Sequence, residues 1–417
     1  MQVRKLQRYG FFSYAVGLAS VGLLLTVVAS GGIAGASSRS LATAHKAVAR
    51  SDDALSGKSY KVAVDLSYYG NDWQTEALNL IKAEAKTAPY SGHVTLRVDI
   101  AGASVPDQIQ AINNEVAAGE QAIVMYPISP TGLNTAIAKA CKAGVVVYAY
   151  NAYVTAPCAH NVTTSDFEFG TLQARGLVKF LNGKGQVAEM TGVAGTSADI
   201  ERRAGWASVL KSYPGIKVVA TANGMWDPAT TQQAFSSLFA SHPDVNGVLA
   251  ETSCQAVEAA LQAQSHSLLP CAGESENQWR VDMLPTSKGG KGVEGISVGG
   301  PAYTGELAFM NAVSILSGHK VPKDMEVPLP YVTSSTLRPG TNVAKGANVF
   351  PASTGLKVST GFFDDLWSPL VNEGVQGAIT GSPDVISTAV PCAKVRGCIT
   401  GSSVKLFLTF GAGTVAE

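Results

Sequence analysis

The sequence lacks a surplus of charge of either sign. Its 417 residues include 31 Lys and Arg against 31 Asp and Glu, so the formal net charge is zero. Binding to nucleic acid depends on an excess of Lys and Arg facing the phosphates, so the balance argues against a nucleic-acid partner and against a polybasic membrane-surface protein. Charged residues make up only 15% and hydrophobic residues 46%, a composition that excludes a disordered chain and favours a globular one.

The sequence also lacks the short motifs of most enzymes and metal sites. Its six histidines stand singly, and neither H-E-x-x-H nor C-x-x-C occurs, which argues against a zinc site. Walker and dinucleotide fingerprints are missing as well. Gly295–Gly299 matches G-x-S-x-G, but the only histidine downstream is His319 and the only acid before it is Glu306, in or beside one predicted helix. We therefore predict a protein that is not an enzyme and that needs no cofactor or metal.

Long apolar runs are missing apart from one near the N-terminus. A basic stretch from Arg4 to Arg8 precedes the uncharged run 11–29, and Ala34-Gly-Ala36 has the form of a cleavage site. This order is typical of a secretory signal peptide, so we predict a signal at residues 1–36 and a linker at 37–57. A retained membrane anchor is the alternative, because the run is close to the minimum that spans a bilayer. Either way, we expect the body of the protein outside the cytoplasm, in the periplasm or at the cell surface.

Six cysteines are present, and their spacing groups them into three local pairs. Six cysteines allow fifteen pairings. In an exported protein we expect disulfides, and the pairs that we predict are Cys141–Cys158, Cys254–Cys271 and Cys392–Cys398. Buried free thiols are the alternative.

From residue 58 onward, short apolar segments alternate with segments of helical periodicity. The predicted strands are 60–66, 94–100, 122–125, 145–150, 186–190, 217–222, 248–251, 268–272 and 292–298. The predicted helices are 73–87, 106–118, 131–143, 198–212, 229–241, 254–264 and 303–316. Strict alternation of this kind indicates α/β architecture, with parallel sheets covered by helices on both faces. Because the series restarts in the middle of the chain, we predict two similar lobes.

Two segments that follow predicted strands and one that leads into a predicted strand carry a family resemblance. They are Asn71-Asp-Trp73-Gln74, then Thr191-Gly-Val-Ala-Gly-Thr-Ser-Ala198 with Glu201-Arg202, and Ser241-His-Pro-Asp-Val245. In order and spacing, the region 58–336 resembles the periplasmic solute-binding proteins of the ribose-binding type, which serve ATP-binding-cassette sugar importers.

The resemblance implies two Rossmann-like lobes with parallel sheets, joined by a three-strand hinge, as in type I periplasmic binding proteins. The N-terminal lobe is expected at 58–164 plus 300–326, and the C-terminal lobe at 165–299 plus 327–340. Residues 341–417 would be a C-terminal extension whose role the resemblance does not give.

The resemblance also implies a ligand site between the lobes, at the carboxyl ends of the strands. A sugar presents C–H faces to aromatic rings and hydroxyls to fixed polar groups. The ligand-binding residues so implied are Asn71, Trp73, Gln74, Tyr150, Asn151, Arg202, Trp226, Thr252 and Ser275. This chain departs from the family after the fourth strand, where Tyr150-Asn151 replaces a frequent Asp-Arg pair, and after the eighth, where Thr252-Ser253 replaces Asn-Asp. The sugar therefore cannot be named from these residues.

Six of these residues also have a purely structural interpretation, and Tyr150 and Asn151 could serve only to turn the chain. Asn71 could serve only as a helix cap. Trp73 and Trp226 could simply pack within a lobe, and Arg202 could form a surface salt bridge with a neighbouring acid.

The function that the resemblance implies is capture of a small polar solute, most simply a sugar, for delivery to a membrane permease. The expected protein is a monomer whose lobes close on the solute. The alternative is a membrane-tethered or secreted sensory domain that binds a signal molecule, a nucleoside or an amino acid.

Overall fold

The computed structural model describes residues 55–339 except 56, 88, 253, 328 and 330, together with 343, β13 (Thr388–Ala389) and β14 (Thr409–Phe410). One compact unit, Ala49–Glu417, contains all the elements described below. The predicted signal peptide, the Cys392–Cys398 pair and nearly all of the predicted linker and C-terminal extension lie outside the described residues.

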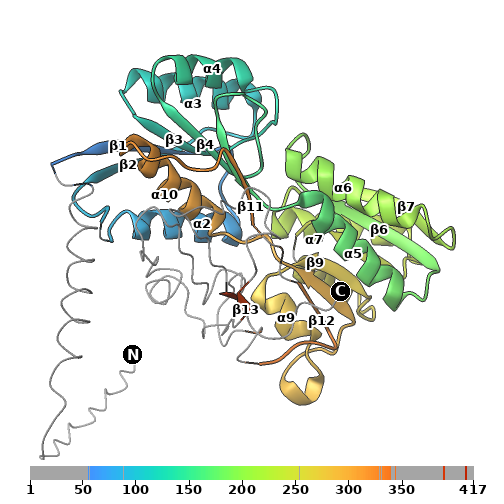
Figure 1. The fold of residues 1–417 in the computed structure, drawn as a ribbon. Helices are drawn as coiled ribbons and strands as arrows, with labels where there is room; N and C mark the ends of the chain where they lie inside the picture. Colours follow the sequence, from blue (N-terminus) through green and yellow to red (C-terminus); the bar gives the residue numbers. More distant parts are fainter. Residues whose placement is uncertain are drawn as a thin grey trace, which may run out of the picture. The chain divides into compact units, whose positions relative to one another are not determined.

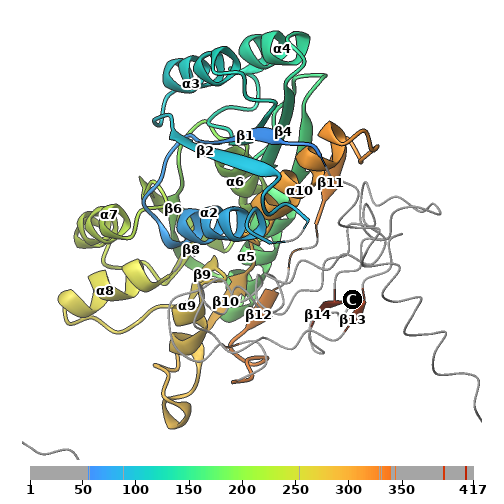
Figure 2. The ribbon, with the colours of Figure 1, turned by 90° about the vertical axis from the view of Figure 1, so that its left-hand side faces the viewer.

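The first sheet has six strands in the order β11-β5-β4-β3-β1-β2, and all neighbouring strands are parallel. The strands are β1 (Tyr60–Leu66), β2 (Val94–Ile100), β3 (Ala122–Tyr126), β4 (Val146–Asn151), β5 (His160–Thr163) and β11 (Asp324–Glu326). The helices are α2 (Asp72–Glu84), α3 (Val105–Ala117), α4 (Asn134–Lys142) and α10 (Thr304–Leu316). Figures 1 and 2 show α3 and α4 on one face of this sheet and α2 and α10 on the other. Because helices cover both faces, the central strand β3 is buried along its whole length.

The second sheet has the order β12-β10-β9-β8-β6-β7. Its strands are β6 (Gly185–Thr191), β7 (Ile216–Asn223), β8 (Gly247–Ala250), β9 (Cys271–Glu274), β10 (Gly295–Val298) and β12 (Tyr331–Thr333). Its helices are α5 (Asp166–Phe180), α6 (Ser197–Leu210), α7 (Pro228–Ser241), α8 (Gln255–Ala263) and α9 (Asn277–Met283), and the 3-10 turn η1 (Thr286–Lys288) follows α9. These strands are parallel except β12, which runs antiparallel to β10 at the edge.

The prediction of two α/β lobes with parallel sheets is confirmed. The chain passes between the sheets three times, between β5 and α5, between β10 and α10, and between β11 and β12. Within the two six-stranded sheets, the antiparallel direction of β12 is the one departure from parallel pairing.

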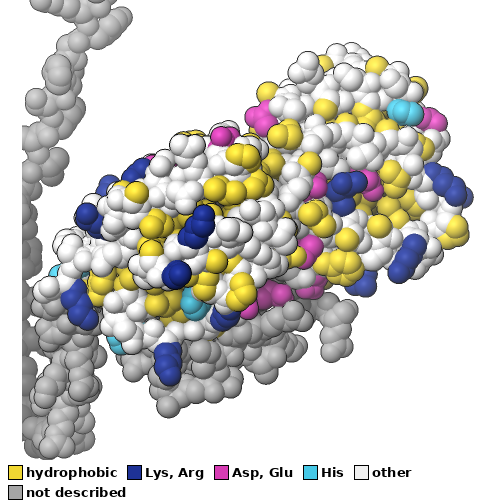
Figure 3. All heavy atoms as spheres, turned by 90° about the horizontal axis from the view of Figure 1, so that it is seen from above, with side chains coloured by type: hydrophobic (Ala, Val, Ile, Leu, Met, Phe, Trp, Pro, Cys, Tyr) yellow, Lys and Arg dark blue, Asp and Glu magenta, His cyan; other side chains and the backbone are white. Residues whose placement is uncertain are grey.

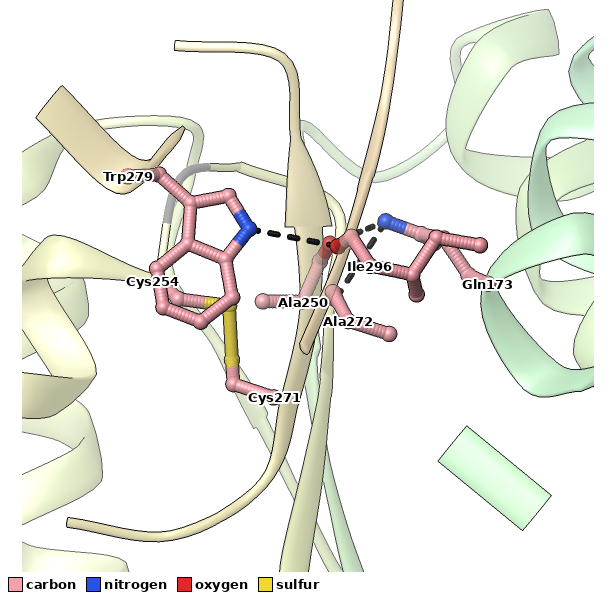
Figure 4. Close-up of a disulfide and its surroundings, with 7 residues drawn as sticks. All are labelled: Gln173, Ala250, Cys254, Cys271, Ala272, Trp279 and Ile296. Carbon is pink, nitrogen blue, oxygen red and sulfur yellow. Dashed lines mark hydrogen bonds between the residues drawn. A yellow bond between two sulfur atoms is a disulfide. The ribbon is translucent and has the colours of Figure 1, made fainter. Parts of the chain in front are cut away.

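Side chains on both faces of the second sheet donate hydrogen bonds to carbonyl oxygens of its strands, as Figure 4 shows. On one face, Gln173 of α5 donates from Nε2 to the carbonyl oxygens of Ala250 (2.8 Å) and Ala272 (3.3 Å). On the other face, Trp279 of α9 donates from Nε1 to the carbonyl of Ile296 at 3.2 Å. Only two residues of β8 pair with β9. Gln173 therefore supplies hydrogen bonds to backbone carbonyls of these strands where the pairing ends.

Two of the three predicted disulfides lie in the described residues, and both are confirmed. Cys141–Cys158 joins α4 to the segment before β5, and Cys254–Cys271 joins the start of α8 to the start of β9. Their Cα atoms are 6.4 and 6.2 Å apart. For these four cysteines the free-thiol alternative is wrong.

The sequence interpretation missed α5 entirely, and the reason lies in two glycines. Gly170 and Gly176 lower helix propensity and interrupt the apolar pattern of the segment. In the structure, a Cβ at Gly170 would lie 2.0 Å from the carbonyl oxygen of Arg202, and one at Gly176 would lie 2.7 Å from the Ile296 side chain. Close packing on α6 and β10 therefore requires these glycines. The strand predicted at 268–272 was also misplaced, because β9 begins at Cys271.

Candidate functional site

A cavity lies between the two lobes, where the carboxyl ends of strands from both sheets face each other. The first lobe lines it with Tyr68, Asn71, Asp72, Trp73, Tyr126 and Asn151, and the second with Arg202, Trp226, Pro228, Thr252, Glu274 and Glu276. Its volume is small, about 40 Å³. We call this cavity the cleft.

Six of the nine residues predicted to bind ligand line the cleft: Asn71, Trp73, Asn151, Arg202, Trp226 and Thr252. The other three, Gln74, Tyr150 and Ser275, are fully buried beside it and do not form its lining. Tyr150 packs behind the lining, with its ring stacked on Trp73 at 6.4 Å between centroids.

Asn71 connects the two lobes directly. It is the N-cap of α2, because its Oδ1 accepts from the backbone N–H of Gln74 at 2.8 Å. Its Nδ2 donates to the carbonyl oxygen of Trp226 at 3.2 Å, 155 residues further along the chain. The capping role and the cross-lobe contact therefore coexist in one side chain.

Trp73 reaches one of the segments that connect the lobes. Its Nε1 donates to the carbonyl oxygen of Gly300 at 2.5 Å, in the segment between β10 and α10. Because the indole N–H is already bonded, Trp73 offers the cleft its ring rather than its donor.

Trp226 enters the cleft through an unusual backbone conformation. Met225 and Trp226 both have left-handed φ angles, 57° and 52°, and the Asn223 side chain stabilises the turn by accepting from the N–H of Met225. The Trp226 ring stacks on Tyr68 of the other lobe, with centroids 6.0 Å apart and planes 30° apart. Its Nε1 is buried and forms no hydrogen bond with the protein. Trp226 therefore lines the cleft with an unpartnered donor at its buried edge.

Arg202 is enclosed rather than exposed. Its Nε donates to Asp166 Oδ1 at 2.8 Å, its Nη1 donates to the carbonyl oxygen of Glu251 at 2.9 Å, and its Nη2 lies 3.6 Å from Glu274 Oε1. The guanidinium also lies 3.9 Å from the centroid of the Phe169 ring. Burial disfavours its charged form, but the surrounding carboxylates outweigh this effect and raise the pKa of Arg202.

Glu274 is an acidic group of the cleft whose pKa is shifted by its surroundings. Burial raises the pKa of its carboxyl to about 7, while Arg202 acts in the opposite direction. The sequence interpretation chose its neighbour Ser275, because a side-chain direction at a strand end cannot be read from spacing. Tyr68 and Tyr126 were missed as well, although both follow or end a predicted strand, which is the one signal that could have found them.

Within the described part of the chain, no cluster of three or more His, Cys, Asp or Glu side chains is arranged to hold a metal ion. No helix among the same residues has the length and apolarity needed to cross a bilayer. Figure 3 shows one face of the molecule, on which the basic side chains are scattered singly.

Comparisons with known proteins agree with this geometry. Residues 62–320 match the family model described as "Periplasmic binding protein domain". The chain is 25% identical to the D-apiose import binding protein of Paraburkholderia graminis, over 49% of this chain and 66% of that protein. It is 25% identical to the xylitol-binding protein of Mycolicibacterium smegmatis (60% and 72%) and 25% identical to the ribose import binding protein of Bacillus subtilis (66% and 88%).

Solved structures show the same fold. An ABC transporter solute-binding protein from Thermobispora bispora superposes with a TM-score of 0.60 at 25% identity, over 67% of this chain and 87% of that one. A galactofuranose-binding protein superposes with a TM-score of 0.60 at 20% identity, over 66% of this chain and 95% of that one.

Proposed function

The chain belongs to the periplasmic binding protein family, and on that premise we propose that it captures a sugar outside the cytoplasm and delivers it to the permease of an ABC importer. Its relatives named above bind apiose, xylitol or ribose according to their names, and these are small polyhydroxylated molecules.

The observation that carries the proposal is a cleft whose lining comes from both lobes. Tyr68 of one lobe and Trp226 of the other present aromatic rings, and the unpartnered Nε1 of Trp226 and Oδ1 of Asn151 supply a donor and an acceptor. Aromatic faces with a few fixed polar groups are what a sugar ring requires.

The mechanism is closure without chemistry. A sugar that contacts both lobes stabilises the closed arrangement by its differential affinity for that state, and the permease recognises the closed form. Tyr68 and Trp226 stack at 6.0 Å, which leaves no room for a sugar between them, so the lobes must separate before the sugar enters. The sugar is then released unaltered.

A calorimetric screen of monosaccharides and polyols against the purified protein tests this proposal. We expect a sugar to bind, and Tyr68→Ala to weaken its binding about tenfold or more through loss of the stacking surface. Tyr213→Ala is the matched control, because Tyr213 is an exposed aromatic in the turn after α6 and does not line the cleft. Failure of every sugar to bind, or turnover of one into a product, would contradict the proposal.

A further inference from the structure

The charges around the cleft do not balance. Of the described residues that line it, only Arg202 carries positive charge. Three carboxyl groups surround this one guanidinium, those of Asp166, Glu274 and Glu251. All four side chains belong to residues that are more than nine-tenths buried, so bulk water and salt screen them little.

One of the three carboxyls favours its neutral form, and a second is already paired with Arg202. Burial and the neighbouring Asp199 raise the pKa of Glu251 well above its usual value, which favours its protonated form. Asp166 lies at 2.8 Å from Arg202 and compensates its charge. The carboxyl that remains, Glu274, is the one that lines the cleft, and it lies at the longer distance of 3.6 Å from Arg202.

The rest of the lining is also suited to a cation. Tyr68 lies 5.4 Å from Tyr126 and Trp73 lies 5.9 Å from Tyr126, measured between ring centroids, and both contacts are edge-to-face, so several aromatic rings gather in one small space. The faces of such rings attract ammonium groups. Asn151 Oδ1, whose residue is only 4% exposed, has no hydrogen-bond partner and lines the same space. An ammonium group has three donors and no acceptor, which matches these acceptors.

This step rests on the proposed function: we propose that the natural guest of the cleft is an amino sugar or amino polyol whose ammonium group lies beside Glu274. The ammonium supplies the positive charge that the cleft lacks, and the hydroxyls meet the aromatic rings and the Trp226 donor. A neutral sugar would leave Glu274 either sharing the Arg202 guanidinium, 3.6 Å away, with the closer Asp166 or obliged to take up a proton.

Matched pairs of amine and neutral sugar test the proposal by calorimetry at pH 7. The pairs are D-glucosamine with D-glucose, D-galactosamine with D-galactose, and D-glucamine with sorbitol. We expect the amine of at least one pair to bind about tenfold to a hundredfold more tightly, the factor typical of a hydrogen bond to a charged group. Equal or tighter binding of the neutral members would overturn the inference and leave the proposed function standing. If no sugar of any kind binds, both fall.

A pH series on the wild-type protein separates charge pairing from simple fit. The charged and titratable groups that face Glu274 are Arg202, Asp166, Glu276 and Tyr68. Alkyl ammonium groups stay charged between pH 5.5 and 7. D-glucamine should therefore bind up to about tenfold more weakly per pH unit as the pH falls and Glu274 takes up a proton. An affinity for D-glucamine that is constant over this range would contradict the proposal.

The variant Glu274→Gln keeps the shape of the side chain and removes its charge. It should reduce the preference for the amine in each pair to about twofold or less, and abolish the pH dependence. Glu189→Gln is the matched control, since Glu189 is a partly buried acid of β6 in the same lobe that does not line the cleft. A Glu274→Gln protein that melts like the wild type and still prefers the amine would overturn the assignment.

Discussion

At the scale of single residues, the place of Trp226 in the cleft depends on Gly192. A Cβ built on Gly192 would lie 2.0 Å from Trp226 Cε2 and 2.1 Å from its Nε1. Gly192 follows β6 directly, so the indole lies against bare backbone at the end of that strand. The ring can reach Tyr68 of the other lobe only because no side chain occupies this position.

We predict that Gly192→Ala destabilises the protein by about 1–3 kcal/mol, the usual cost of overpacking a filled site. The measurement is urea unfolding in a double-mutant cycle. In a Trp226→Ala background the added methyl group meets empty space, so the cost should largely disappear. The same cost in both backgrounds would show that the ring does not depend on this glycine.

The sequence indicated which residues line the cleft better than it indicated what surrounds them. Asn71, Trp73, Arg202 and Trp226 were selected from the family resemblance, and all four line the cleft. Whether they contact a ligand stays a prediction. That Arg202 is enclosed by carboxyl groups could not be predicted, because Asp166 and Glu274 lie 36 and 72 positions away in the sequence.

At the scale of elements, the two disulfides connect similar elements but differ in their position relative to the cleft. Both close loops with a sequence separation of 17, and both connect a helix with a strand or its approach. Cys254 follows Thr252 by two residues, and Cys271 begins the strand that ends at Glu274. The N–H of Glu274 also donates to the carbonyl oxygen of Thr252 at 2.9 Å. Cys254–Cys271 therefore holds together two segments that line the cleft.

We predict that replacing either disulfide by two alanines lowers the free energy of unfolding by about 3 kcal/mol, the value for loops of this size in the chain-entropy model. Only the Cys254→Ala/Cys271→Ala protein should also bind its sugar more weakly. The Cys141→Ala/Cys158→Ala protein is the control for loss of stability alone. Denaturant unfolding and calorimetry measure the two quantities, and an equal loss of affinity in both proteins would contradict this assignment.

At the scale of the whole molecule, a group of buried acids in the first lobe makes stability depend on pH. Burial raises the pKa of Asp65 to about 7, with a further contribution from Asp99, while Gln108 acts in the opposite direction. Burial together with Asp65 and Asp99 raises the pKa of Glu115 to about 10. Both carboxyls therefore hold protons in the folded protein that the unfolded chain releases near pH 4.

The sign of the effect follows from these shifts. Because the folded pKa values lie above the unfolded ones, this contribution to stability is complete below about pH 4 and is lost as the pH rises. Both groups contribute to the loss up to about pH 7, and Glu115 alone continues it toward about pH 10. We predict lower stability at pH 9 than at pH 7, with a slope of up to about 1.4 kcal/mol per pH unit from one group.

Urea unfolding between pH 7 and 9 measures this slope. Glu115→Gln should flatten it, and Glu168→Gln, at an exposed position of α5, should leave it unchanged. If the Glu115→Gln protein keeps the full slope, Glu115 is not its source.

The sequence by itself determined the alternation of strands and helices, the export-compatible cysteine pairs and the family resemblance. Each of these depends on local periodicity or on short separations, which a single chain displays directly. The tertiary structure alone decided which side chains meet in the cleft. The Asn71–Trp226 hydrogen bond and the Tyr68–Trp226 stack join residues about 155 positions apart on different lobes. Such contacts arise only when two independently patterned sheets are packed together, and no pattern within either half of the sequence records that packing.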